Sequence, residues 1–284
     1  MDPLILANLL RSELYMYRAF YGLTCNPFSK DIPVQRLYKS ANYKQFVGRM
    51  EYFKQAKGFA VVYGLPGVGK TTALRVFTAT LNPQLYRVVY LPLSILTVRE
   101  FYRNLAMGLG LIPMQKKVDM FHQIQDQIIN FHHQKKQTPF IILDEGQFLG
   151  GSVLNELRML FNFQMDSQNH AMVLICAQPV LVNQLNLHIH EPLRQRITVH
   201  HEFTGLPKEE VGECLTTLLA SAGLDEPLFT PDAIEALSNA SQGRLRVICS
   251  TAEKALILGA QKQLRQLDSS IILAAHEEAN IYAS

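Results

Sequence analysis

The fold of this 284-residue chain is decided by one stretch of sequence, Phe59-Ala60-Val61-Val62-Tyr63-Gly64-Leu65-Pro66-Gly67-Val68-Gly69-Lys70-Thr71-Thr72. Its first five residues form an apolar run that is typical of a buried strand. Residues Gly64 to Thr71 fit the pattern G-x-x-x-x-G-K-[ST], and apolar periodicity over 70–81 predicts a helix directly after it. The pattern therefore stands between a strand and a helix, as it requires, and predicts a loop that cradles phosphate groups.

The residue types in this loop indicate how phosphate would bind. Glycines let backbone N–H groups turn inward, and the helix that follows adds free N–H groups and the positive end of its dipole. We expect Lys70 to contact the β and γ phosphates of ATP, Thr71 to ligate Mg²⁺, and Thr72 to contact the α phosphate. The nucleotide-binding residues expected from the loop are Gly64, Pro66, Gly67, Val68, Gly69, Lys70, Thr71 and Thr72. The alternative is a flexible glycine loop before an ordinary helix.

A second motif is acidic and follows the apolar run Phe140 to Leu143. We expect Asp144 to hold Mg²⁺ through water, as the second metal residue beside Thr71. Glu145 is expected to act as a general base toward an attacking water, so the motif predicts ATP hydrolysis as well as binding. The alternative is that the two carboxylates cap the turn that follows them.

Short apolar runs alternate with longer helical patterns through the middle of the chain. The expected strands lie near 59–63, 86–92, 139–143, 171–176 and 197–203, and the expected helices near 70–81, 97–109, 118–136, 152–165 and 179–188. This alternation predicts an α/β fold whose parallel sheet is covered by helices on both faces. Ligands of such sheets bind at the carboxyl ends of the strands, where the loop and Asp144 both fall.

Turn-forming residues divide the chain into three expected segments: an N-terminal helix and lead-in loop (1–35), an α/β nucleotide-binding domain (36–204) and a helical domain (205–284). Residues 1–15 carry Leu4, Leu6, Leu9, Leu10 and Leu14, a pattern that predicts a short amphipathic helix. Packing on the body of the protein is favoured over docking of a partner for this helix.

Composition excludes several classes of protein. The apolar runs are far shorter than the ~18 residues that a membrane helix needs, and the N-terminus lacks the features of a secretory signal. We therefore expect a cytoplasmic protein that does not span a membrane. The 4 cysteines are scattered, which disfavours a zinc site or a disulfide framework, and a net charge of +3 does not by itself indicate nucleic-acid binding.

Three segments together resemble AAA+ ATPases of the ExeA type, a group that includes the transposition ATPases TnsC, TniB and MuB. They are the phosphate loop, the Leu-Asp-Glu-Gly-Gln run at 143–147, and the opening Met16 to Leu23 followed by Asn26-Pro27-Phe28. The resemblance runs from about residue 16 to the helical C-terminus. It implies an AAA+ P-loop NTPase with a parallel five-stranded sheet flanked by helices, and a C-terminal helical lid domain.

The resemblance also implies roles for polar residues outside the two motifs. Gln178 matches the residue that senses the γ phosphate, although Ala177 replaces the glycine that usually precedes it. Arg196, or else Arg194, matches the arginine finger that reaches the nucleotide of a neighbouring subunit, so a homo-oligomer, either a ring or a helical filament, is expected. Arg246 matches the sensor arginine of the lid. The alternatives are a helix-initiating Gln178, an intramolecular ion pair for the finger candidates and an ordinary surface arginine at 246.

Basic residues suggest two surfaces for double-stranded DNA. Arg99, Arg103, Lys116 and Lys117 follow the second expected strand, where related AAA+ proteins place DNA-contacting elements. The stretch 243–266 is also rich in basic residues, and a solvated helix face explains it equally well. Any contacts are expected to be to the phosphate backbone, and therefore to be sensitive to salt and poor in sequence specificity.

These observations favour a regulator of DNA transposition that oligomerises on target DNA with ATP, recruits or activates a transposase, and disassembles on hydrolysis. ExeA-like secretion ATPases usually add a membrane span and a cell-wall-binding domain, and this sequence ends after its helical segment, which we take to favour transposition. One alternative is a cytosolic ExeA-like ATPase that assists assembly of a secretion apparatus. Another is a nucleotide-gated interaction module.

Overall fold

The computed structural model describes residues 16–29, 33–92, 97–164 and 168–279. The amphipathic helix expected over 1–15, with Leu4, Leu6, Leu9, Leu10 and Leu14, lies outside these residues. The chain forms two compact units. Of the described residues, those within 42–66 and 70–203 form an α/β unit, and those within 16–41, 67–69 and 204–279 form a helical unit.

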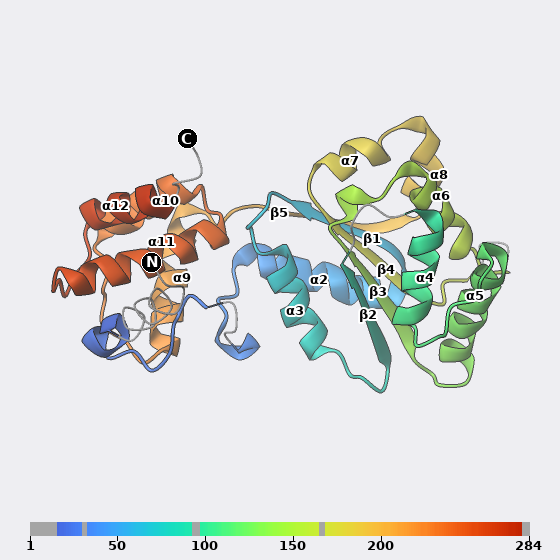
Figure 1. Ribbon diagram of the computed structural model, residues 1–284, viewed down its shortest axis with the longest axis horizontal. Helices are drawn as coiled ribbons and strands as arrows, with labels where there is room; N and C mark the ends of the chain where they lie inside the picture. Colours follow the sequence, from blue (N-terminus) through green and yellow to red (C-terminus); the bar gives the residue numbers. More distant parts are fainter. Residues whose placement is uncertain (1–15, 30–32, 93–96, 165–167, 280–284) are drawn as a thin grey trace, which may run out of the picture. The chain divides into compact units, whose positions relative to one another are not determined.

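The α/β unit is built on a five-stranded sheet in which every neighbouring pair is parallel (Figure 1). Its strands are β1 (Gly58–Gly64), β2 (Tyr86–Pro92), β3 (Thr138–Asp144), β4 (Met172–Ala177) and β5 (Ile197–Phe203). They lie in the order β2-β3-β4-β1-β5. The parallel five-stranded α/β fold predicted from the sequence is confirmed, because runs that are apolar on both faces form the central strands β1, β3 and β4.

Helices cover both faces of this sheet, as Figure 1 shows. The helices of the unit are α2 (Ala41–Ala56), α3 (Lys70–Thr80), α4 (Val98–Gly108), α5 (Lys117–His133), α6 (Gly151–Leu160), α7 (Val180–Leu185) and α8 (Glu191–Arg194). Alternate strand residues such as Val61, Ile141 and Ile175 share an apolar core with α4, α5 and α6. On the other face, Phe46 of α2 packs on Phe77 of α3.

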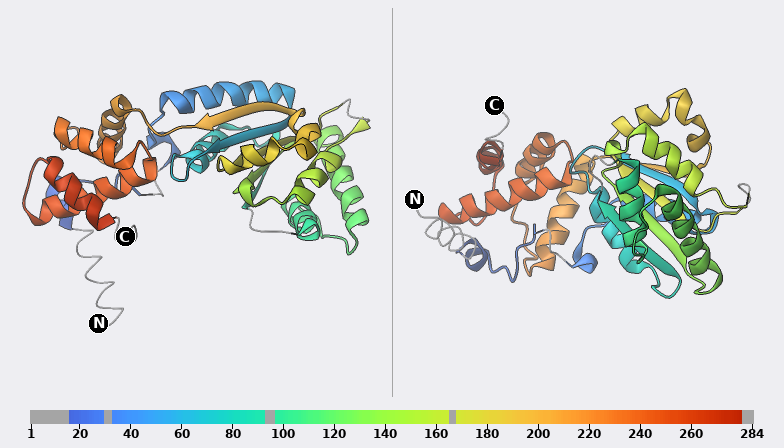
Figure 2. Two further views of the ribbon diagram at one scale, coloured as in Figure 1. Left: turned by 90° about the horizontal axis from the view of Figure 1, so that it is seen from above. Right: turned by 45° about the vertical axis from the view of Figure 1, so that its right-hand side comes forward.

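Helix α2 is an element that the sequence patterns did not predict. Only three of its 16 residues are buried apolar side chains, namely Phe46, Met50 and Phe53, and the rest are mainly polar or exposed. Figure 2 shows α2 running along β5, where the Asn42 amide donates to the carbonyl of Glu202 over 3.1 Å. A narrow apolar stripe gives a weak periodic signal, so contacts with a distant strand define this helix.

Two expected helices end earlier than the patterns suggested. The helix expected over 152–165 stops at Leu160, and the one expected over 179–188 stops at Leu185, followed by the short 3₁₀ turn His188–His190. The apolar residues that extended the first of these patterns, Phe161 and Phe163, are buried from non-helical backbone. The sequence therefore stays apolar beyond the end of the helix because these side chains are also buried.

The helical unit contains α9 (Lys208–Ser221), α10 (Pro231–Ser241), α11 (Leu245–Gln261) and α12 (Ser269–Ala279), and the short 3₁₀ turn η1 (Val34–Arg36). The N-terminal segment shares the core of these helices through Tyr17, Tyr21, Leu23 and Phe28. The Tyr21 hydroxyl donates to the carbonyl of Leu264 over 3.0 Å. Segments from the two ends of the described chain therefore form one hydrophobic core.

Candidate nucleotide-binding site

The loop between β1 and α3 has a backbone that only glycine adopts without strain. Gly67 has φ +83° and Gly69 has φ +105°, both in the region that side chains disfavour. At Gly64 an added Cβ would collide with the carbonyl oxygen of Phe203 on the neighbouring strand β5. Gly67 and Gly69 are therefore required by their positive φ angles, and Gly64 by its close packing against β5. The backbone N–H groups at the start of α3 are available to bind an anion.

The motif lysine is held inside this loop. Lys70 is the first residue of α3, and its ammonium donates to the carbonyls of Gly64, over 2.8 Å, and of Leu65, over 3.0 Å. These are neutral acceptors, and a phosphate oxygen is a stronger, charged acceptor in the same region. Elsewhere in the loop Pro66 is exposed, Val68 is buried and Thr72 is half-buried.

Asp144 is buried at the carboxyl end of β3, with 5% of its surface exposed. The Thr71 hydroxyl donates to its Oδ2 over 3.2 Å, and the Glu145 backbone N–H donates to its Oδ1 over 2.9 Å. A hydroxyl beside a carboxylate is an oxygen pair of the kind that Mg²⁺ prefers, directly or through water. The structure therefore brings together the two residues predicted to hold the metal.

A residue that the sequence analysis missed completes this cluster. The Tyr90 hydroxyl on β2 donates to Oδ2 of Asp144 over 2.7 Å. Tyr90 is 48% exposed as a whole, but desolvation of its hydroxyl beside Asp144, with the hydrogen bond to that carboxylate, raises the pKa of Tyr90. The phenol therefore stays protonated and remains a donor. The sequence feature that could have indicated Tyr90 is its position near the carboxyl end of β2, the strand that pairs with the Asp144 strand β3.

The thiol of Cys176 also lies near Asp144. Burial, reinforced by the adjacent Asp144 carboxylate, raises the pKa of this thiol. It therefore remains a neutral thiol.

Glu145 follows Asp144 in a left-handed conformation, with φ 58° and ψ 37°, and its side chain is exposed. The Gln147 amide donates to Glu145 Oε2 over 2.6 Å, and its oxygen accepts from the backbone N–H of Gln178 over 3.1 Å. Gln178 follows β4 directly and is half-buried. The structure therefore places the predicted base and the predicted sensor on either side of Gln147, to which the sequence analysis gave no role.

The two arginine-finger candidates lie at the amino end of β5, away from the loop of their own chain. Arg196 donates to the carbonyl of Arg158, at 2.6 Å, and Arg194 donates to the carbonyl and the side chain of Asn186, each at 3.4 Å. Because β5 runs parallel to β1, this end of the sheet is ~20 Å from the carboxyl ends of the strands. Neither arginine reaches the phosphate loop of the same chain.

Arg246 lies in the first turn of α11 in the helical unit. Its backbone N–H donates to the carbonyl of Gly67 over 2.9 Å, and a Cβ at Gly67 would lie 3.0 Å from its Cβ. The loop tip thus packs on the backbone at Arg246 within this unit.

The four predicted DNA-contacting residues lie on two elements that follow β2. Arg99 and Arg103 are on α4, whereas Lys116 caps α5 and Lys117 begins it. Arg99 donates to the carbonyl of Gln115 over 3.0 Å, which brings the two pairs together. Lys117 pairs with Glu156, while Arg103 and Lys116 are exposed.

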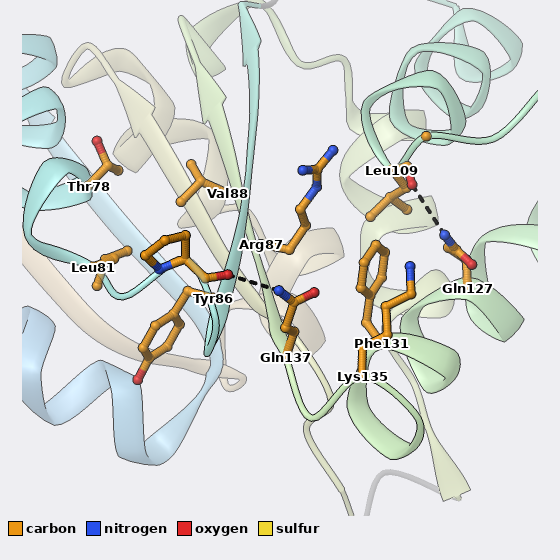
Figure 3. Close-up of a pocket in the computed structure, with 12 residues that line it drawn as sticks. Thr78, Leu81, Tyr86, Arg87, Val88, Leu109, Gln127, Phe131, Lys135 and Gln137 are labelled. Carbon is orange, nitrogen blue, oxygen red and sulfur yellow. Dashed lines mark hydrogen bonds between the residues drawn. The ribbon is translucent and has the colours of Figure 1, made fainter.

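A cavity among the described residues is separate from this site. It has a volume of about 550 Å³. Tyr86, Arg87 and Val88 from the amino-terminal half of β2 line it (Figure 3). The loop and Asp144 lie instead at the carboxyl ends of the strands. The Gln127 amide donates to the carbonyl of Leu109, and the Gln137 amide donates to the carbonyl of Pro83, as the dashed lines show. Its location excludes it as the place where the phosphate loop binds a ligand.

Comparison with known proteins agrees with this geometry. Residues 53–185 match the family of the AAA domain. The match covers just under half of the chain, and the matched residues contain the phosphate loop, Asp144, Glu145 and Gln178. The resemblance to AAA+ ATPases of the ExeA and MuB group, predicted from the sequence, is confirmed by the relatives described next.

General secretion pathway protein A of Aeromonas hydrophila is 30% identical over 272 residues, which cover 94% of this chain and 49% of that protein. The chain therefore spans about half the length of that relative. ATP-dependent target DNA activator B of Escherichia phage Mu is 30% identical over 126 residues, which cover 44% of this chain and 38% of that protein. The solved structure of Cdc6p from Pyrobaculum aerophilum matches with a TM-score of 0.68 at 16% identity, over 89% of this chain and 70% of that one. This last likeness shows the AAA+ fold.

Proposed function

We propose that this chain binds ATP with Mg²⁺ at Gly64–Thr72 and hydrolyses it. The observation that carries the proposal is the position of the Thr71 hydroxyl, 3.2 Å from the Asp144 carboxylate and one residue after Lys70. A hydroxyl and a carboxylate meet there, and the Lys70 ammonium lies on the carbonyls of the glycine loop that opens the helix. This set of groups suits a phosphate chain with a bound divalent cation.

Each residue of the site has a distinct task in this proposal. Lys70 exchanges its two carbonyl partners for phosphate oxygens, and Thr71 and Asp144 hold Mg²⁺. Bound Mg²⁺ offsets the negative charge of the phosphates. Glu145, exposed next to Asp144, accepts a proton from the attacking water. Gln178 and Arg246 report the presence of the γ phosphate from the end of β4 and from the helical lid.

The active form in this proposal is a homo-oligomer, a ring or a filament. Arg196, with Arg194 as the second candidate, lies at the amino end of β5 and cannot serve the loop of its own chain. An arginine that stabilises charge on the transferring phosphoryl group must therefore come from a neighbouring subunit. Hydrolysis then depends on assembly.

We place this ATPase in DNA transposition, in the prokaryotic cytoplasm. With ATP the chain assembles on double-stranded DNA, recruits or activates a transposase, and leaves the DNA on hydrolysis. Support comes from the relative in phage Mu whose name describes an ATP-dependent target DNA activator. The cluster of Arg99, Arg103, Lys116 and Lys117 supplies the contacts to the phosphate backbone.

One observation favours a second candidate, an ATPase that assists assembly of a secretion apparatus. The similarity to general secretion pathway protein A extends over 94% of this chain, whereas the similarity to the phage protein covers 44%. None of the described helices is long and apolar enough to cross a membrane.

Electron microscopy with duplex DNA and a slowly hydrolysed ATP analogue tests the main proposal. We expect regular assemblies on DNA that require the analogue and are absent for Lys70→Ala, with Lys44→Ala on the exposed face of α2 as the matched control. Bare particles under all conditions would overturn it. Disassembly after addition of ATP is expected to be slower for Glu145→Gln than for the wild type. Equal rates would instead favour a nucleotide-gated interaction module.

A further inference from the structure

Gln147 makes two hydrogen bonds with its one side-chain amide. Its Nε2 donates to Glu145 Oε2 over 2.6 Å, and its Oε1 accepts from the Gln178 N–H over 3.1 Å. Glu145 precedes the 3₁₀ turn Gly146–Phe148, and Gln178 follows β4, so the amide joins the ends of two neighbouring strands.

The orientation of this amide is determined by its partners. A carboxylate only accepts hydrogen bonds and a backbone N–H only donates one. The amide must therefore turn its nitrogen to Glu145 and its oxygen to Gln178, since the opposite orientation would lose both bonds. The two contacts depend on each other because one planar group makes them.

The backbone between these residues has little freedom. A Cβ at Gly146 would collide with Cγ2 of Ile175 on β4 and would lie 3.3 Å from the carbonyl oxygen of Cys176. Glu145 itself adopts a left-handed conformation that is uncommon for a side-chain-bearing residue. The turn thus presses against the end of β4, and any shift of that strand end moves Gln147.

We propose that Gln147 is the residue that positions Glu145 and couples it to the end of β4. This inference rests on the proposed role of Glu145 as the base for hydrolysis. Gln147 holds the carboxylate at the place where it receives a proton from water. A change at residue 178 on nucleotide binding reaches the base through this amide. Its task is to set the geometry of Glu145 without touching the nucleotide.

A purely structural role is the competing explanation, since a side chain that bridges a turn to a strand also stabilises the fold. The two explanations differ in what they predict for catalysis. A structural bond affects stability and binding alike, whereas a positioning residue affects turnover while nucleotide affinity stays the same.

The test compares Gln147→Ala and Gln147→Met, which keeps the length and removes the hydrogen bonds, with the control Gln184→Ala. The Gln184 amide bonds the carbonyl of Leu149 over 3.1 Å and touches neither Glu145 nor Gln178. We expect both Gln147 variants to lower kcat by about 10- to 100-fold, because a small misplacement of a reacting group has that effect. The dissociation constant for a fluorescent ADP analogue and the melting temperature should match those of Gln184→Ala.

A double-variant series separates this inference from the proposed function. In the Glu145→Gln background, Gln147→Ala should cause no further loss of turnover, because both substitutions act through one group. An unchanged kcat in both Gln147 variants, or an equal further loss in that background, overturns the inference. If Glu145→Gln alone hydrolyses ATP as fast as the wild type, the proposed function fails instead.

Discussion

The hydroxyl of Tyr90 on β2 and the carboxylate of Asp144 on β3 form a hydrogen bond of 2.7 Å at the carboxyl ends of the two strands. The same carboxylate oxygen accepts a bond from Thr71 on α3. Side chains from α3, β2 and β3 therefore meet at one oxygen atom of Asp144. Each oxygen of this buried carboxylate therefore has a hydrogen-bond donor.

The first prediction concerns this bond. Tyr90→Phe removes one donor to a buried carboxylate, and we expect it to lower the free energy of unfolding by about 1–2 kcal/mol. Urea unfolding followed by circular dichroism measures the change. Tyr52→Phe, at a tyrosine 59% exposed, is the control and should leave stability unaltered. A Tyr90 variant as stable as that control would mean that the bond contributes nothing to stability.

The second prediction contrasts two glycines. Gly64→Ala adds a methyl group that collides with the backbone of Phe203, so we expect a loss of about 1–3 kcal/mol in stability. Gly48→Ala adds the same methyl group to the exposed face of α2, where nothing lies within 4 Å. It should raise stability by about 0.5–1 kcal/mol, because alanine favours helix. Thermal melting of both variants gives the sign of each change in stability. Changes of the same sign would contradict the packing described for β1 and β5.

The third prediction concerns pH. His201 on β5 is 2% exposed, and burial, with smaller effects from Arg49 and His200, lowers its pKa to about 4. The unfolded chain, with a histidine pKa of ~6.5, binds more protons between these values. Stability from this group is therefore complete above pH ~6.5 and is lost as the pH falls toward 4, by up to about 3 kcal/mol.

The measurement for His201 is urea unfolding at pH 7.5, 6, 5 and 4.5. We expect the stability difference between the wild type and His201→Phe to shrink as the pH falls, because only the wild type loses this contribution. His188→Phe is the control, since His188 is fully exposed. A difference that stays constant with pH would show that His201 does not titrate in this window.

The fourth prediction tests the shared site. Arg196→Ala should lower ATP hydrolysis by about 100-fold or more, because an arginine finger stabilises charge in the transition state. Mixing Arg196→Ala with Glu145→Gln should restore part of the activity, since some interfaces then combine an intact Glu145 with an intact Arg196. Activity is measured as phosphate release at several mixing ratios. No recovery at any ratio, with Arg194→Ala recovering instead, would assign the finger to Arg194.

Much of the fold was predictable because its signals are local. The order of apolar runs and helical patterns predicted the five strands and the layered α/β arrangement, and the fold is confirmed. Helix α2 was missed because its apolar stripe is narrow and it is defined by contacts with β5. The union of residues 16–28 with the C-terminal helices was missed because no local pattern pairs the two ends of a chain.

The sequence by itself determined the phosphate loop and the acidic pair, because a glycine-rich turn between a strand and a helix encodes its own backbone shape within eight residues. It also indicated that Thr71 and Asp144 would share one edge of the sheet, since both follow parallel strands. Only the tertiary structure decided that Tyr90 bonds Asp144 and that Gln147 lies between Glu145 and Gln178. Those contacts depend on strand register and on turn packing, which are set by the whole sheet.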